Sequence, residues 1–89
     1  MSGAHVERSI IGRGVKINSY SEVSDSILMD GVQVGRRAEL HRVICDKEVI
    51  VPEGFVIGRD PQRDRNHFKV TEQGIVVIPK GLDLGELFS

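Results

Sequence analysis

The fold is decided by residues 6–56, which read VERSIIGRGVKINSYSE (6–22), VSDSILMDGVQVGRRAE (23–39) and LHRVICDKEVIVPEGFV (40–56) when written in lines of seventeen. The lines place apolar residues in four columns, which are Val6-Val23-Leu40, Ile10-Ile27-Ile44, Val15-Val32-Val49 and Ile17-Val34-Val51, and Ile57, the first residue after the third line, continues the first column. A fixed period of this kind is typical of a solenoid, in which each turn buries its apolar residues against the next. The repeat therefore predicts a solenoid over residues 6–58.

Short β-branched segments indicate that this solenoid is built from strands. Val15 and Ile17 flank a polar residue, as do Val32 and Val34, and this two-residue alternation is that of a strand. We expect turns with positive φ at six glycines, which are Gly12, Gly14, Gly31, Gly35, Gly54 and Gly58. Apolar residues six apart, such as Val34 and Leu40, are typical of hexapeptide repeats. The pattern predicts three triangular coils of parallel strands, with the apolar residue of each face pointing inward.

Composition narrows the classes of function. The 89 residues include 12 Lys and Arg against 13 Asp and Glu, without a run of like charge, which argues against a nucleic-acid or membrane partner. The single cysteine, Cys45, excludes an intramolecular disulfide and is in register with Ile11 and Leu28, so we interpret it as a small buried hydrophobe. The first residues lack the features of a signal peptide, and no apolar run is long enough to span a bilayer. A cytoplasmic location is expected.

The repeat stops after Gly58. Residues 59–66 are charged and polar and predict an excursion, residues 71–74 predict a turn, and residues 75–78 predict a strand that returns to cover the open end of the solenoid. An apolar tail follows, formed by Leu82, Leu84, Leu87 and Phe88. The expected division is therefore a start or cloning remnant at 1–5, coils at 6–58, and a linker, capping strand and tail at 59–89.

Two segments carry a family resemblance. The segment VPEGFVIG (51–58), followed at a distance by GIVVIPKG (74–81), resembles the C-terminal region of bacterial glucose-1-phosphate adenylyltransferase, also called ADP-glucose pyrophosphorylase. The resemblance implies a left-handed parallel β-helix that serves tetramer assembly and allosteric control. It also implies, as partners, other subunits and a nucleotidyltransferase domain that uses ATP and magnesium, so this chain itself is expected to hold no cofactor and no catalytic residue.

Four basic residues are candidates for contact with a phosphorylated effector. The resemblance places Lys80 where the family has a basic residue that contacts the effector, and Lys47 near a corner close to bound nucleotide. Arg36 and Arg37 are predicted at a corner, where adjacent guanidinium groups suit an oxyanion. The effectors implied are phosphorylated sugars or adenine nucleotides.

A second class of function stays open, because hexapeptide solenoids also occur as acyltransferases and metal-dependent enzymes. His41, expected at the corner after Leu40, is the candidate general base for acyl transfer. A zinc site would need three ligands to converge, and His5, His41 and His67 are expected in separate parts of the chain. No metal site is predicted.

Overall fold

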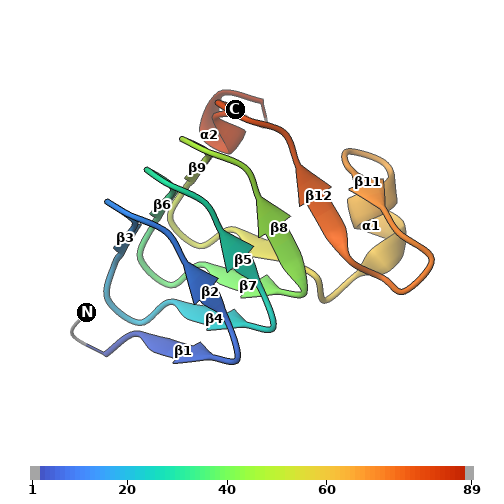
Figure 1. The fold of residues 1–89 in the computed structure, drawn as a ribbon. Coiled ribbons are helices and arrows are strands. Elements are labelled where there is room, and N and C mark those ends of the chain that lie inside the picture. Colours follow the sequence, from blue (N-terminus) through green and yellow to red (C-terminus); the bar gives the residue numbers. More distant parts are fainter. Residues whose placement is uncertain (1–2, 88–89) are drawn as a thin grey trace.

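The chain forms a three-sided stack of parallel strands (Figure 1). The computed structural model describes residues 3–87, apart from the side chains of Pro61 and Leu87. One side, here called the carboxylate face, consists of β1 (His5–Glu7), β4 (Glu22–Ser24), β7 (Glu39–His41) and β10 (Val56–Ile57). The second, here called the aliphatic face, consists of β2 (Ile10–Ile11), β5 (Ile27–Leu28), β8 (Val43–Cys45) and β12 (Val76–Ile78), with β11 (Lys69–Val70) at its edge. The third face consists of β3 (Lys16–Ile17), β6 (Gln33–Val34) and β9 (Ile50–Val51).

The register of the stack is that of the sequence repeat. Val6 pairs with Val23, Val23 with Leu40 and Leu40 with Ile57, each in parallel strands. The third face repeats this arrangement, since Ile17, Val34 and Val51 are paired in order. Almost all of these side chains are buried in one core. The predicted parallel β-helix is therefore confirmed, with its strands paired between coils.

The residues of the Ile10 column pair in the predicted register, but their side chains do not point into the core as predicted. Ile10, Ile27 and Ile44 are paired as expected, yet the side chain of Ile10 is 66% exposed and the other two are only half-buried. Successive residues of a strand point to opposite sides, and Leu28 and Cys45, one residue later, are fully buried. The Ile10 column therefore forms an apolar ridge on the outside of the aliphatic face.

The corners of the coils also recur every seventeen residues, and most of them are not glycine. Positive φ angles occur in three columns, which are Gly3-Tyr20-Arg37-Gly54, Arg8-Asp25-Arg42 and Gly14-Gly31-Glu48. The prediction was wrong for Gly12 and Gly35, whose φ angles are not positive. A side chain at Gly35 would instead place its Cβ 2.5 Å from the backbone nitrogen of Glu53 in the next coil, so glycine is required there for close approach.

A fourth coil follows the three repeats, with an insertion between its first and second faces. β12 pairs with β8 at a separation of thirty-three residues, so that Val76 lies beside Val43 and Ile78 beside Cys45. The same separation continues on the third face, where Asp83 forms a bridge with Ile50. The predicted strand at the end of the solenoid is thus present, and it is in register with the coil below it. In Figure 1 the inserted α1 (Pro61–Arg65) and β11 lie beside β12, at the opposite end of the aliphatic face from β2.

Two carboxylates anchor the insertion. The side chain of Asp60 accepts a hydrogen bond from the backbone nitrogen of Arg63 and caps α1. The buried side chain of Asp64 accepts one from the backbone nitrogen of Gly58, where the chain leaves the coil. The chain then returns through β12 to α2 (Leu84–Leu87), which begins with the fully buried Leu84. Part of the predicted apolar tail is therefore buried within the chain itself, while Phe88 lies outside the described residues.

Candidate functional site

The structure stacks two of the predicted effector residues on each other. Lys47 and Lys80 occupy equivalent positions in the third and fourth coils, at the corner between the aliphatic and third faces, and the backbone nitrogen of Gly81 donates to the carbonyl oxygen of Lys47 at 2.9 Å. Both side chains are exposed, and neither has an ion pair within residues 3–87. We call this pair the lysine corner.

Neighbouring coils are separated by about 4.8 Å, the spacing of paired strands. Two lysines one coil apart are close enough for both ammonium groups to reach a single oxyanion, to which each can donate a charge-assisted hydrogen bond. The side chain of the acidic neighbour Asp46 accepts from the backbone nitrogen of Lys47 at 2.7 Å, and no carboxylate within residues 3–87 forms an ion pair with either lysine. The lysine corner is thus suited to bind a phosphate group.

Arg36 and Arg37 lie at a different corner, between the third and carboxylate faces. Arg37 has a φ of 59° and donates its backbone nitrogen to Ser19, and the carbonyl of Arg36 accepts from Gly54 in the next coil. Both side chains are exposed. The predicted corner position is correct, but these residues do not join the lysine corner.

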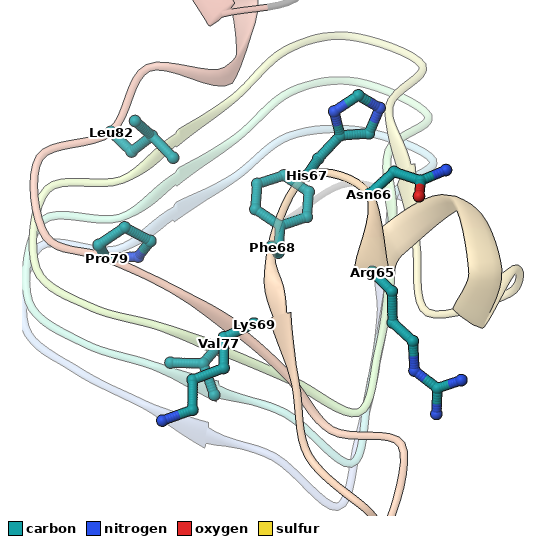
Figure 2. Close-up of a pocket in the computed structure, with 8 residues that line it drawn as sticks. All are labelled: Arg65, Asn66, His67, Phe68, Lys69, Val77, Pro79 and Leu82. Carbon is teal, nitrogen blue, oxygen red and sulfur yellow. The ribbon is translucent and has the colours of Figure 1, made fainter.

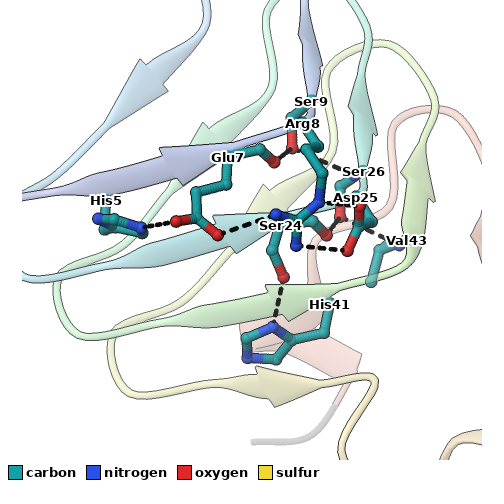
Figure 3. Close-up of polar contacts among 9 residues, drawn as sticks. All are labelled: His5, Glu7, Arg8, Ser9, Ser24, Asp25, Ser26, His41 and Val43. Carbon is teal, nitrogen blue, oxygen red and sulfur yellow. Dashed lines mark hydrogen bonds and ion pairs between the residues drawn. The ribbon is translucent and has the colours of Figure 1, made fainter.

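The outer surface of the carboxylate face carries hydrogen-bonded polar side chains (Figure 3). The hydroxyl of Ser24 lies 2.7 Å from Nδ1 of His41, and Nε2 of the same ring lies 3.2 Å from Oε1 of Glu39. Arg59 donates from Nε to that same oxygen of Glu39 at 2.5 Å. His41, followed by Arg59, lowers the pKa of Glu39 below its usual value of 4.5. The result is a serine–histidine–glutamate chain whose carboxylate is held ionised.

An ion pair joins the first two coils at the neighbouring corner. Arg8 and Asp25 both have positive φ and sit one above the other, with Nε of Arg8 at 2.7 Å from Oδ1 of Asp25. The hydrogen bond from Arg8 lowers the pKa of Asp25, and the charges of Arg42 and His41 act in the same direction. In contrast to Lys47 and Lys80, Arg8 is thus paired with a carboxylate of the next coil.

One group within the described part of the chain has the composition of a metal site. Ligand atoms of Glu22, Glu39 and His41 lie within 4.8 Å of one another on the carboxylate face. Arg59 already pairs with both carboxylates, at 2.5 Å from Glu39 and 3.9 Å from Glu22. The group is therefore an ion-pair cluster in which one arginine already contacts both carboxylates, and the absence of a metal site stays a prediction.

The histidines and the cysteine lie in separate places. His5 is in β1, His67 follows α1, and His41 is inside β7 instead of at the corner, where Arg42 has the positive φ. The corner was misplaced by one residue because its residues are not glycine. Cys45 is fully buried, and burial raises the pKa of its thiol to about 12, which confirms that it is a buried hydrophobe.

Several of these features had no obvious signal in the sequence. Three of the six non-glycine residues with positive φ could have been found from the seventeen-residue period, since Tyr20 and Arg37 share a column with Gly54, and Glu48 shares one with Gly31. The column of Arg8, Asp25 and Arg42 contains no glycine and gave no such signal. Nothing in the repeat indicates that Arg59, beyond its end, folds back onto Glu39. The burial of Asp64 likewise depends on the insertion and has no counterpart in the three regular coils.

Stacked coils, corner columns and hexapeptide spacing together define the chain as a hexapeptide-repeat β-helix protein. A family model described as GlmU-like, C-terminal hexapeptide matches residues 1–78, and the chain belongs to this family. No helix within residues 3–87 is long and apolar enough to cross a membrane.

The chain is similar to the C-terminal region of curated glucose-1-phosphate adenylyltransferases. The protein of Anaeromyxobacter sp. (strain Fw109-5) is 49% identical over 82 residues, which cover 92% of this chain and 20% of that protein. The one of Deinococcus radiodurans is 49% identical over 91% of this chain, and the one of Trichlorobacter lovleyi is 50% identical over 89%. The chain thus spans about a fifth of the length of these relatives, and the resemblance seen in the sequence is confirmed.

Proposed function

We propose that this chain is the assembly and allosteric module of a glucose-1-phosphate adenylyltransferase, the enzyme that makes ADP-glucose and pyrophosphate from ATP and glucose 1-phosphate. In this proposal catalysis, with its magnesium and ATP, belongs to a separate nucleotidyltransferase domain in the cytoplasm. The module binds that domain and other subunits of a homotetramer, and it responds to phosphorylated sugars or adenine nucleotides. Similarity to relatives with that name over about nine-tenths of the chain supports the proposal.

The lysine corner is the observation that best supports the proposed regulatory role. Lys80 follows the insertion, yet the thirty-three-residue register returns it to a position directly above Lys47. Two lysines that form no ion pair within residues 3–87 and lie on neighbouring coils support a contact with the phosphate of an effector. The second predicted pair, Arg36 and Arg37, stays a proposal for a separate phosphate contact.

The test of the regulatory part uses the complete enzyme that contains this region. Replacing Lys47→Gln or Lys80→Gln should raise the effector concentration for half-maximal response by roughly tenfold, since each loses one charged hydrogen bond. Lys16→Gln is the matched control, because Lys16 is exposed on the third face and belongs to no predicted site. Unchanged effector response in both lysine-corner variants would refute the proposed site.

The aliphatic face supports the assembly part. Ile10, Ile27, Ile44 and Val77 form its outer ridge, and none of the four is fully buried. Uncharged aliphatic ridges of this kind are typical of subunit interfaces. We expect the isolated chain to self-associate at micromolar concentration in sedimentation experiments, and Ile27→Lys to weaken the association. A compact monomer at all concentrations would contradict this part of the proposal.

Acyl transfer is a second candidate function, and one observation favours it. Ser24, His41 and Glu39 are linked in the order of a nucleophile, a base and an orienting carboxylate. In such a reaction Ser24 Oγ would attack an ester carbonyl and pass its proton to His41 Nδ1, and His41 would return that proton to the departing alcohol. Water, deprotonated by the same ring, would then hydrolyse the acyl-serine and restore the Ser24 hydroxyl. Hydrolysis of p-nitrophenyl acetate that is lost in both Ser24→Ala and His41→Gln would support this candidate, and a rate equal to that of free imidazole would exclude it.

A further inference from the structure

A cavity of about 610 Å³ lies between the insertion and the fourth coil (Figure 2). Phe68 lies across its middle in the view of Figure 2, with Pro79 and Leu82 on one side and Asn66 and Arg65 on the other. The lining is mostly apolar, and the volume falls within the range of sites for small organic molecules. No sequence-predicted site residue contributes to it, although Pro79 comes directly before Lys80.

The walls of the cavity are fixed by hydrogen bonds and strand pairing. The backbone nitrogen of Phe68 donates to the carbonyl oxygen of Asp64 at 2.7 Å, and Asp64 in turn holds Gly58. Lys69, the next residue, pairs with Val77 in the antiparallel ladder between β11 and β12. The Phe68 side chain is only 9% exposed, so its ring is a firmly packed part of the wall. The cavity is therefore shaped before any ligand arrives.

The ionisable residues that line the cavity are all basic. Arg65, His67 and Lys69 contribute to the lining, and no acidic residue does. Arg65 and Lys69 have exposed side chains that form no ion pair within residues 3–87. The ring of His67 meets that of Phe68 edge to face, with their centroids 6.3 Å apart. The cavity thus combines an apolar lining with two exposed cationic side chains, which extend to different sides in Figure 2.

We propose that this cavity binds a small organic anion that carries a flat ring. The ring lies against Phe68, Pro79 and Leu82, where it buries apolar area, and the anionic group meets Lys69, which borders the cavity beside Val77. A phosphate and a carboxylate share this chemistry, since both accept charged hydrogen bonds. The site is separate from the lysine corner and adds a second ligand to the module.

Titration of the full chain by amide NMR tests the proposal with four probes. Adenosine 5′-monophosphate tests a ring that carries a phosphate, and 1-naphthoate tests a ring that carries a carboxylate. Adenosine supplies a ring without the anionic group, and inorganic phosphate supplies the anion without a ring. We expect saturable shifts at Phe68, Lys69 and Leu82 with at least one ring-bearing anion, and roughly tenfold weaker binding of adenosine and of phosphate alone. Equal binding of adenosine, or no shifts at these residues with either anion, would overturn the proposal.

Variants distinguish this site from the lysine corner. Lys69→Gln should weaken binding of the anion by roughly tenfold without affecting the fold, because its side chain is exposed. Phe68→Leu should weaken it further, with circular dichroism as a check on folding. Lys16→Gln and Lys80→Gln should leave the shifts at Phe68 unchanged. If Lys69→Gln also has no effect, the cavity proposal fails, while the lysine corner is still decided by its own variants.

Discussion

The three regular coils contain no insertion, whereas the fourth coil contains one. All four coils are nevertheless paired in register. In the regular coils every face follows the last at a constant distance in sequence, and the corners stack without extra residues. The fourth coil accepts α1 and β11 between two of its faces and still pairs Ile78 with Cys45. The comparison shows that an insertion at one corner leaves the core intact and creates a surface that the repeats lack. Both the lysine corner and the cavity are consequences of that return to register.

The largest expected effect compares one core leucine from each region. Leu40→Ala in the third coil and Leu84→Ala in the fourth each remove a fully buried side chain, so each should lower the free energy of unfolding by about 2–5 kcal/mol. Urea unfolding followed by circular dichroism measures both. A loss for Leu84→Ala below about 1 kcal/mol would show that the fourth coil is not part of the cooperative core.

A smaller effect is expected where the two regions meet. Asp64→Ala leaves the backbone nitrogen of Gly58 without its acceptor and should cost about 1–3 kcal/mol. Asp64→Asn keeps an oxygen acceptor and is the matched control. Amide exchange of Gly58 should accelerate strongly in the alanine variant and much less in the asparagine variant. Equal exchange in the two variants would mean that Asp64 does not anchor the insertion.

Acidification tests the contact that Arg59 makes with the regular coils. The lowered pKa of Glu39 means that its pairing stabilises the folded chain above pH 4.5 and that this contribution is lost as the pH falls through the lowered pKa. Arg59→Gln should therefore lower the unfolding temperature slightly at pH 7, by the equivalent of less than about 1 kcal/mol. The difference from the unchanged chain should shrink as the pH falls below 4.5 and disappear once Glu39 is protonated in both chains. A constant difference at all pH values would contradict the assignment.

The smallest effect concerns a corner column in which glycine is the rule. Glu48 has a φ of 60° and shares its column with Gly14 and Gly31. Glu48→Gly should relieve the backbone and stabilise the chain by roughly 0.5–1 kcal/mol. Gly31→Ala, at a φ of 76°, is the reciprocal change and should destabilise it. If both changes are neutral in thermal unfolding, positive φ is not what selects glycine in this column.

The sequence predicted what the period controls. Burial of Val23, Val34 and Leu40 followed from their spacing, because a repeat buries equivalent side chains equivalently. The outward direction of Ile10 did not follow, since Ile10 and Ile11 are both apolar and only the coil geometry decides which one faces the core. An apolar residue at a repeating position thus reliably belongs to a column. Where two apolar residues are adjacent, the sequence does not show which of the two side chains points into the core.

The candidate sites were predictable only in part. The corner positions of Lys47 and Arg37 were foreseen, but stacking of Lys80 on Lys47 depends on how many residues the insertion contains. Phe68 and Lys69 drew no attention as site residues, because they have no repeat partner and owe their position to β11 pairing with β12. Contacts that cross an irregular segment are set by its tertiary packing, and a periodic pattern carries no information about them.

Amide hydrogen exchange tests the central claim most directly, because both binding proposals require the fourth coil to be in register with the third. The backbone nitrogens of Asp46, Ile50 and Val76 donate to Ile78, Leu82 and Arg42 across this junction. We predict protection of these three amides within about tenfold of that of Gln33, whose nitrogen donates to Val49 between regular coils. Exchange of the three at unprotected rates, with Gln33 still protected, would contradict the account.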